Sequence, residues 1–144
     1  IDIRRNRSEV FNYLKLTKNQ DNFSVWNMAD PGMKKEFHGT DGTEGFVYTW
    51  DSANKNVGAG EQETKAIVDG KSIEFEVRFF RPMKNTGKVY FRIDKKSEKI
   101  TGVTWIFDSP SKFPYSLIAP IFKKILGKDL EKGLINLKGI LEKV

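Results

Sequence analysis

The chain has no cysteine and a single histidine, His38, among its 144 residues. The lack of cysteine excludes disulfide bonds, a thiol nucleophile and thiolate ligands for a metal ion. One histidine leaves little material for a Ser-His-Asp site and none for a zinc site built from several histidines. The sequence therefore lacks the residues of the commonest catalytic and metal centres, and we expect no cofactor.

Long apolar runs are also missing. The longest, residues 117–122, has six residues, whereas a helix needs about 20 to cross a bilayer. With 38% apolar and 31% charged residues, the composition is that of a soluble globular chain. The length suits one domain, so we expect residues 1–144 to form a single domain in the cytoplasm. Because the chain starts at Ile1 and not at methionine, we interpret it as a fragment, and an upstream membrane tether stays open.

The net charge of +6 is concentrated in one segment, since residues 111–144 carry seven basic and three acidic groups. Such a segment either contacts an anionic membrane surface or is a solvated helix face, and the second interpretation is favoured. We expect no nucleic-acid partner. The lysines concerned are Lys123, Lys124, Lys128, Lys132 and Lys138.

Helical signals occur at both ends of the chain. The segment Asn6-Arg7-Ser8-Glu9 has the pattern of a capping box that opens a helix. A second short helix is predicted over residues 22–26. Near the C-terminus apolar residues recur at helical spacing, which predicts a long helix from about Pro120 to Glu142.

Between Met33 and Asp108 the apolar residues alternate with polar ones, which is typical of half-buried strands. About six antiparallel strands are expected there, after a short strand and two helices. A single antiparallel sheet has one face to bury, and the long helix is the obvious cover. The pattern therefore predicts an α+β domain with two layers.

Aromatic residues are abundant and fall on the inward strand faces. On the sheet these are Trp50, Phe75, Phe79, Phe91 and Trp105, and the last helix adds Phe122, Ile125 and Leu126. They either line a pocket for a hydrophobic ligand or simply fill the core. Tyr48 and Gln62 share the inward side and would be the polar groups of such a pocket.

Two acidic residues, Glu61 and Glu63, are the nearest approach to a catalytic carboxylate pair. Their alternation with Gln62 predicts that both side chains face solvent. His38 is likewise expected on the surface. In the last helix Gly127 and Gly133 either let the helix approach the sheet closely or leave room for a ligand.

Several segments of the chain resemble segments of one protein family, and they occur in the same order as in that family. They are 8–14 (SEVFNYL), Trp26 with Asp30-Pro31, 39–45 (GTDGTEG), 57–61 (VGAGE), 103–105 (VTW) and 127–138 (GKDLEKGLINLK). Together they resemble bacterial polyketide cyclase/dehydrase and lipid-transport proteins of the SRPBCC, or START-like, superfamily, which includes the major birch pollen allergen. The resemblance implies the helix-grip fold, with six or seven strands around a long C-terminal helix. It also implies a cavity for lipids, sterols or polyketides, but no shared catalytic motif.

Three function classes follow from these observations. The leading one is a non-catalytic module that binds or carries a small hydrophobic molecule. The second is a cyclase or dehydratase acting on a polyketide-like substrate, for which Tyr48 and Glu61 are the candidate acid or base residues. The third is a protein-interaction module, as in the chaperone-ATPase activators that share the fold. A filled core and an exposed apolar patch would favour the third class.

Overall fold

A computed structural model describes residues 1–54, 57–81, 84–108 and 119–143, and of residues 119–126 it describes the backbone only. One sheet contains seven strands in the order β1-β7-β6-β5-β4-β3-β2, and all neighbouring strands are antiparallel. The strands are β1 (Asp2–Ile3), β2 (Lys34–His38), β3 (Val47–Asp51), β4 (Ala59–Val68), β5 (Ser72–Arg81), β6 (Asn85–Lys95) and β7 (Thr101–Asp108). The helices are α1 (Arg7–Leu14), the 3-10 helix η1 (Thr17–Asn22), α2 (Val25–Met28) and α3 (Ala119–Leu141).

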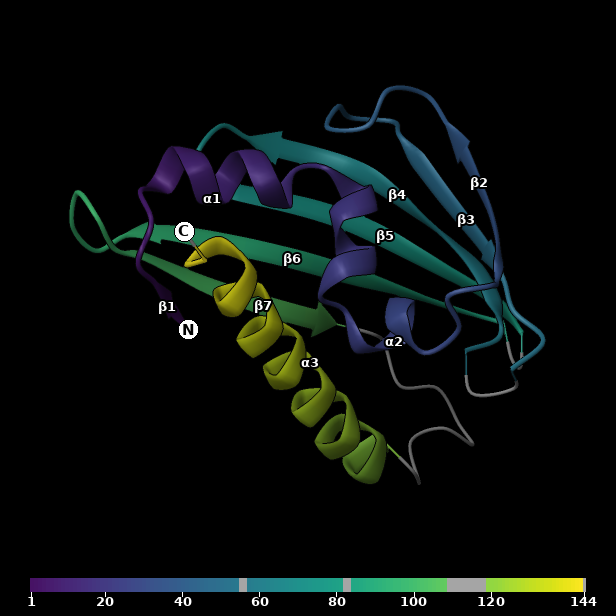
Figure 1. Cartoon of the computed structure of the whole chain (residues 1–144). Coiled ribbons are helices and arrows are strands. Elements are labelled where there is room, and N and C mark those ends of the chain that lie inside the picture. The colour runs from purple at the N-terminus through teal and green to yellow at the C-terminus, as the bar shows by residue number, and fades with distance from the viewer. Residues whose placement is uncertain (55–56, 82–83, 109–118, 144) are drawn as a thin grey trace.

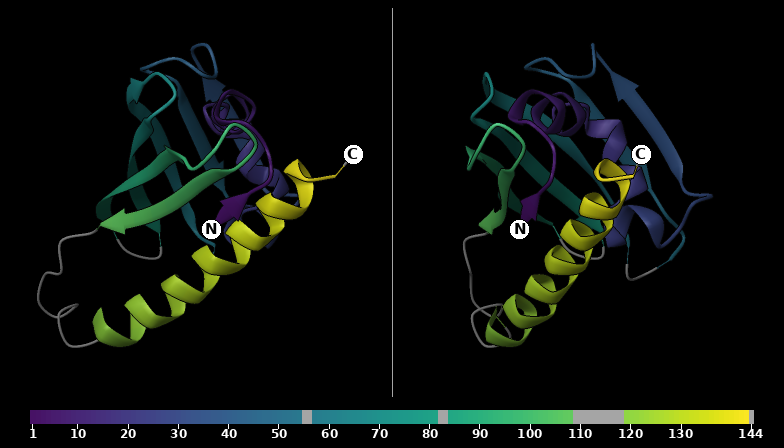
Figure 2. Two further views of the ribbon diagram at one scale, coloured as in Figure 1. Left: turned by 90° about the vertical axis from the view of Figure 1, so that its left-hand side faces the viewer. Right: turned by 60° about the vertical axis from the view of Figure 1, so that its left-hand side comes forward.

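All helices lie on one side of the curved sheet, as Figure 1 and both views of Figure 2 show. The long helix α3 contacts β1, β7 and α2, while α1 and η1 lie over the middle strands (Figure 1). The predicted α+β architecture is confirmed, and α3 begins and ends within one residue of the predicted bounds. Within the described residues, no helix combines the length and the apolar character that a membrane span needs.

The capping box at the start of α1 is confirmed. The Asn6 side-chain oxygen accepts a hydrogen bond from the Glu9 backbone N–H at 2.9 Å, and the Asn6 amide donates to the Glu9 carboxylate at 2.9 Å. The second bond therefore joins two side chains, whereas in the common form it returns to the cap backbone. The Asn6 side chain thus satisfies one backbone N–H of the first turn of α1.

The second short helix differs from the prediction over residues 22–26. The chain forms η1 up to Asn22 and starts α2 only at Val25. Phe23 interrupts the two helices because its ring is fully buried and packs edge-on against Phe91 and Trp105, with centroids 6.2 and 5.6 Å away. Tertiary packing of one aromatic ring thus overrides continuous helical geometry here.

The alternation along β5 is confirmed by burial. Ile73, Phe75 and Val77 are at most 5% exposed and belong to the core. The residues between them point to the other side of the sheet, where Arg78 bonds to neighbouring carboxylates. The sheet therefore has an apolar concave face under the helices and a charged convex face.

A glycine allows β4 to bend where it begins. The pairing of β4 with β5 shifts register between Ala59 and Gly60. A Cβ atom at Gly60 would lie 2.5 Å from the Arg78 carbonyl oxygen and 2.8 Å from the ring of Trp50. The indole of Trp50, from the paired position on β3, therefore lies directly against a residue that has no side chain.

Candidate functional site

The aromatic residues predicted to face inward do lie on the concave side of the sheet. Phe91 stacks on Trp105 with centroids 5.1 Å apart, and Phe75 meets Phe91 edge-on at 6.1 Å. Phe75 and Phe91 are fully buried, so both contribute to the packed core. Trp50 and Phe79 are half-buried and pack edge-on at 5.9 Å near the far end of β3 and β5. Their contact with a ligand stays a prediction.

An apolar groove of about 490 Å³ lies between α3 and the edge of the sheet formed by β1 and β7. Its volume falls in the usual range for small-molecule sites. Its lining residues are Ile1, Trp105, Gly127, Leu130, Glu131, Leu134 and Ile135. Glu131 is the one charged side chain among them, so an apolar molecule would find mostly aliphatic and aromatic contacts.

Of the seven predicted site residues whose side chains are described, Trp105 is the one that lines this groove. Phe122, Ile125 and Leu126 lie outside the residues whose side chains are described. Leu130 and Leu134 follow the apolar stripe that predicted α3, and the same periodicity would have placed them in the lining. Ile1 carries no such signal, because only the packed fold brings the chain start beside the helix. Ile135 carries none either, since it is not part of the apolar stripe.

Gly133 allows close packing and leaves no room for a ligand. A Cβ atom there would lie 2.8 Å from a ring carbon of Trp105 and 3.4 Å from the Phe23 carbonyl oxygen. Gly127 is different, because a Cβ atom there would meet none of the described atoms within 4 Å and the residue borders the groove. Close packing is therefore the role of Gly133, and room for a ligand at Gly127 stays a prediction.

Tyr48 takes part in a polar cluster between β3 and η1. Its hydroxyl donates to the Asp21 carboxylate at 2.6 Å, and Asp21 also accepts from Asn27 at 2.9 Å and from Lys35 at 3.0 Å. Burial, together with the hydrogen bond to Asp21 and its negative charge, raises the pKa of Tyr48 far above the usual range. The hydroxyl is therefore neutral and already engaged, and sequence reasoning missed Asp21 because it is 27 positions away.

Gln62 lies beside Tyr48, since the two residues are directly paired across β3 and β4. Its side-chain nitrogen is buried and, within the described residues, has no hydrogen-bond partner. The same holds for Nε2 of Gln20 and for the indole nitrogen of Trp105. A buried donor without a partner costs about 1–3 kcal/mol, so such groups are uncommon in folded proteins. Gln20 was not predicted from the sequence.

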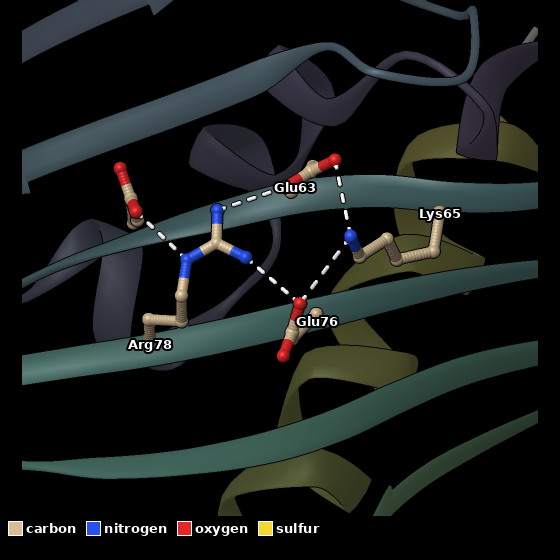
Figure 3. Close-up of polar contacts among 5 residues, drawn as sticks. Glu63, Lys65, Glu76 and Arg78 are labelled. Atoms are coloured by element: carbon tan, nitrogen blue, oxygen red, sulfur yellow. Dashed lines mark hydrogen bonds and ion pairs between the residues drawn. The ribbon is translucent and has the colours of Figure 1, made fainter.

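Glu61 and Glu63 face the convex side, as predicted. Both accept hydrogen bonds from the Arg78 guanidinium, at 2.7 and 2.9 Å, and Glu76 accepts a third at 2.8 Å. Figure 3 shows Arg78 between the carboxylates of Glu63 and Glu76, with Lys65 close to both. The hydrogen bond from Arg78 lowers the pKa of Glu63, and Lys65 adds to the effect. This cluster joins β4 to β5.

The remaining polar candidates lie on the surface. The side chain of His38 is 68% exposed, as predicted. In the described ranges no three His, Asp or Glu side chains are grouped so that they would hold a metal ion. Lys128 and Lys132 are exposed on α3, whereas Lys123 and Lys124 lie outside the described side chains.

Lys138 departs from the predicted free lysine face. Its ammonium group donates to the Asp2 carbonyl oxygen at 2.7 Å and also bonds to Glu142. Glu142 in turn accepts from the backbone and side chain of Arg4, at 2.9 and 3.1 Å. The end of α3 is thereby joined to β1, so this lysine has a structural role.

Comparison with known proteins gives similar structures but no close relative. No protein-family model matches the chain, and no curated protein matches it. Among solved structures, a START superfamily protein from Mycobacterium smegmatis shares 15% identity, with 99% of this chain and 93% of that one covered and a TM-score of 0.62. Major latex-like protein 151 from Panax ginseng shares 16% identity over 99% and 94% of the chains, also with a TM-score of 0.62.

A third similar structure is the Aha1 dimer from Colwellia psychrerythraea, at 13% identity over 99% and 92% of the chains and a TM-score of 0.59. Identities this low carry information about fold alone. The alignments with these structures cover 99% of this chain. The element order of the chain and its helices on one side of the sheet are those of the helix-grip fold, which the resemblance of its sequence segments implied.

Proposed function

We propose that the protein binds a small hydrophobic molecule, such as a lipid, sterol or polyketide-like compound, between the sheet and α3. The observation that carries this proposal is the apolar groove of about 490 Å³ beside Trp105. Burying apolar ligand surface in such a groove contributes about 25 cal/mol per Å². The groove thus supplies a driving force for binding without any catalytic group.

In this proposal the site extends from the groove over the concave face. Trp50, Phe79 and Trp105 would contact the ligand from the sheet, with the fully buried Phe75 and Phe91 behind them. From α3 the lining would include Phe122, Ile125 and Leu126. Gln62 would be its polar group, beside the Tyr48 hydroxyl that is bonded to Asp21. Half-buried Trp50 and Phe79 support this extension, because large aromatic rings left partly exposed on a concave face offer contact area to a ligand.

The test is binding of Nile red, an uncharged dye whose fluorescence rises in apolar surroundings. The unmodified protein should enhance its fluorescence saturably. Gly127→Leu should weaken binding at least tenfold, because the new side chain would occupy the groove.

Gly139→Leu is the matched control. It makes the same substitution on the same helix, at an exposed position with open space around it, and should leave binding unchanged. Equal binding by both variants would place the dye elsewhere, and no binding by the unmodified protein would contradict the proposed function.

The enzyme alternative needs an inward acid or base, for which Tyr48 or Glu61 was named. Glu61 is on the convex side, bonded to Arg78, and so does not face inward. Tyr48 is on the concave side, but its hydroxyl donates to Asp21. The arrangement of these two residues therefore does not favour acid–base chemistry by either.

The interaction-module alternative has one observation in its favour. Ile135 is 56% exposed and Ile1 is 39% exposed, and both border the groove. One of the similar structures is described as a dimer. In this alternative the groove would bind a protein surface, and Ile135→Lys would then abolish an association of the unmodified protein that sedimentation measures.

A further inference from the structure

The interior has an excess of hydrogen-bond donors. Within the described residues, the buried side-chain nitrogen and oxygen atoms that lack a partner are Nε2 of Gln20, Nε2 of Gln62 and Nε1 of Trp105. All three are N–H groups, and no buried acceptor of these residues lacks a partner. Gln20 and Trp105 are only 5% and 8% exposed, so bulk water does not reach these donors freely.

Contacts between η1 and the sheet bring the two glutamines to one region. The Thr17 hydroxyl of η1 lies 3.4 Å from the Thr64 hydroxyl of β4. One helical turn further, Asp21 accepts the hydrogen bond from Tyr48, the residue paired with Gln62. Gln20 precedes Asp21 on η1, and Gln62 is two residues from Thr64 on the same face of β4. The η1 helix therefore lies over β4, and the two glutamines, one from each element, belong to the region where η1 and β4 meet.

Trp105 borders this region from the other side. Its ring packs edge-on against Phe23, at 5.6 Å between centroids, and Phe23 directly follows η1. Trp105 also lines the apolar groove. The donors thus lie along the concave face from η1 to the groove, each next to aromatic or aliphatic side chains.

The charges of this region disfavour an anion. Lys35 is 3.0 Å from the Asp21 carboxylate and is paired with it. On η1, the backbone N–H groups of Thr17 and Lys18 are bonded to a second carboxylate, Asp41, at 2.7 and 3.1 Å. The exposed side chain of Lys18 places its ammonium over the Phe37 ring, 4.3 Å from the centroid. Among the described residues a buried carboxylate ligand would therefore find neutral donors but no buried cation that lacks a partner, and burial of an unpaired charge is strongly unfavourable.

We propose that the bound hydrophobic molecule is uncharged and carries a carbonyl-type oxygen, which accepts hydrogen bonds from the Gln20 and Gln62 side-chain amides. This rests on the proposed function and narrows its ligand class. A ketone, ester or lactone fits, because its oxygen supplies the acceptor that the region lacks without bringing a charge. A fatty-acid anion or a plain hydrocarbon fits less well, the first for its charge and the second for its lack of an acceptor.

Competition against Nile red tests the ligand class with compounds of matched length: 2-tridecanone, methyl laurate, laurate and dodecane. The ketone and the ester should displace the dye at lower concentrations than laurate or dodecane, by about two- to ten-fold, the range expected for one hydrogen bond. Equal displacement by all four compounds would overturn the inference while leaving the proposed function intact. Failure of Nile red itself to bind would overturn both.

Variants test the residues. Gln62→Leu and Gln20→Leu remove the donors with little change of shape and should each remove most of the preference for 2-tridecanone over dodecane. The amide nitrogens that these variants remove have no partner to lose, and thermal melts check that both variants are folded. Asn12→Leu, on the exposed face of α1, is the matched control and should keep the preference. An unchanged preference in both folded glutamine variants would contradict the assignment.

Discussion

The two ends of the described part of α3 meet the rest of the protein in opposite ways. From Gly133 to Glu142 the helix is docked: Leu137 is fully buried, and Asn136 donates to the Phe23 carbonyl oxygen at 3.1 Å. From Gly127 to Ile135 it borders an open groove, so the two parts overlap in the turn around Gly133. The difference teaches that one helix can provide both the anchor and the wall of a binding site, with glycine used for close contact in one part and for space in the other.

The strongest way to break the docked part is to place a side chain at Gly133. Gly133→Leu should lower the free energy of unfolding by about 1–3 kcal/mol, the usual cost of overpacking, because its Cβ atom would lie 2.8 Å from Trp105. Urea denaturation measures the change. Gly139→Leu should be at least as stable as the unmodified protein, since leucine favours helix over glycine. Two equally stable variants would show that α3 is not docked at Gly133.

The second prediction concerns the bonds that end the docked part. Hydrogen bonds from Lys138 and from the Arg4 backbone lower the pKa of Glu142 to about 2, below its ordinary 4.5. A lowered carboxyl pKa in the folded state stabilises the protein above pH 4.5, and this contribution is lost as the pH falls toward 2.

Glu142→Gln should therefore lower the melting temperature at pH 7, with a difference from the unmodified protein that shrinks between pH 5 and pH 2. Thermal melts across this range measure it. Glu36→Gln, at a side chain that is 74% exposed, serves as the control and should change little at any pH. A Glu142→Gln difference that stays constant with pH would contradict the linkage of α3 to β1 through this carboxylate.

The smallest expected effect concerns the exposed lysines of α3. If Lys128 and Lys132 contact an anionic membrane surface, binding to phosphatidylserine vesicles should weaken steeply between 50 and 200 mM salt. Over this range the Debye length falls about two-fold, so the lysines are more strongly screened from the lipid charges. The double variant Lys128→Gln/Lys132→Gln should reduce it further, while Lys138→Gln should affect stability more than vesicle binding. Absence of vesicle binding at low salt would leave these lysines a solubilising role only.

The sequence was sufficient to predict the layers and the strand faces. Alternation identified the buried side of β5 correctly, because successive side chains in a strand point to opposite faces of the sheet. The same rule placed Glu61 and Glu63 on the convex face. The helical period predicted α3 because its apolar stripe must meet the sheet.

The site was harder to predict because it depends on contacts between distant segments. Tyr48 was predicted as a polar group of the pocket, but the sequence did not indicate that Asp21 of η1 is the partner of its hydroxyl. Gly133 was open to two interpretations, and only the position of the Trp105 ring decided between them. Ile1 lines the groove through the pairing of β1 with β7, which joins positions about 100 residues apart. None of these contacts follows from local periodicity.

Native mass spectrometry of the protein purified from its own host tests the central claim most directly. The account predicts that the unmodified protein and the Gly139→Leu variant carry a bound molecule of low mass, and that Gly127→Leu carries little or none. Fragmentation of the released molecule should show a neutral compound with a carbonyl group. A bound molecule retained in full by Gly127→Leu would contradict the groove as the binding site, and the absence of any bound molecule together with no Nile red binding would contradict ligand binding altogether.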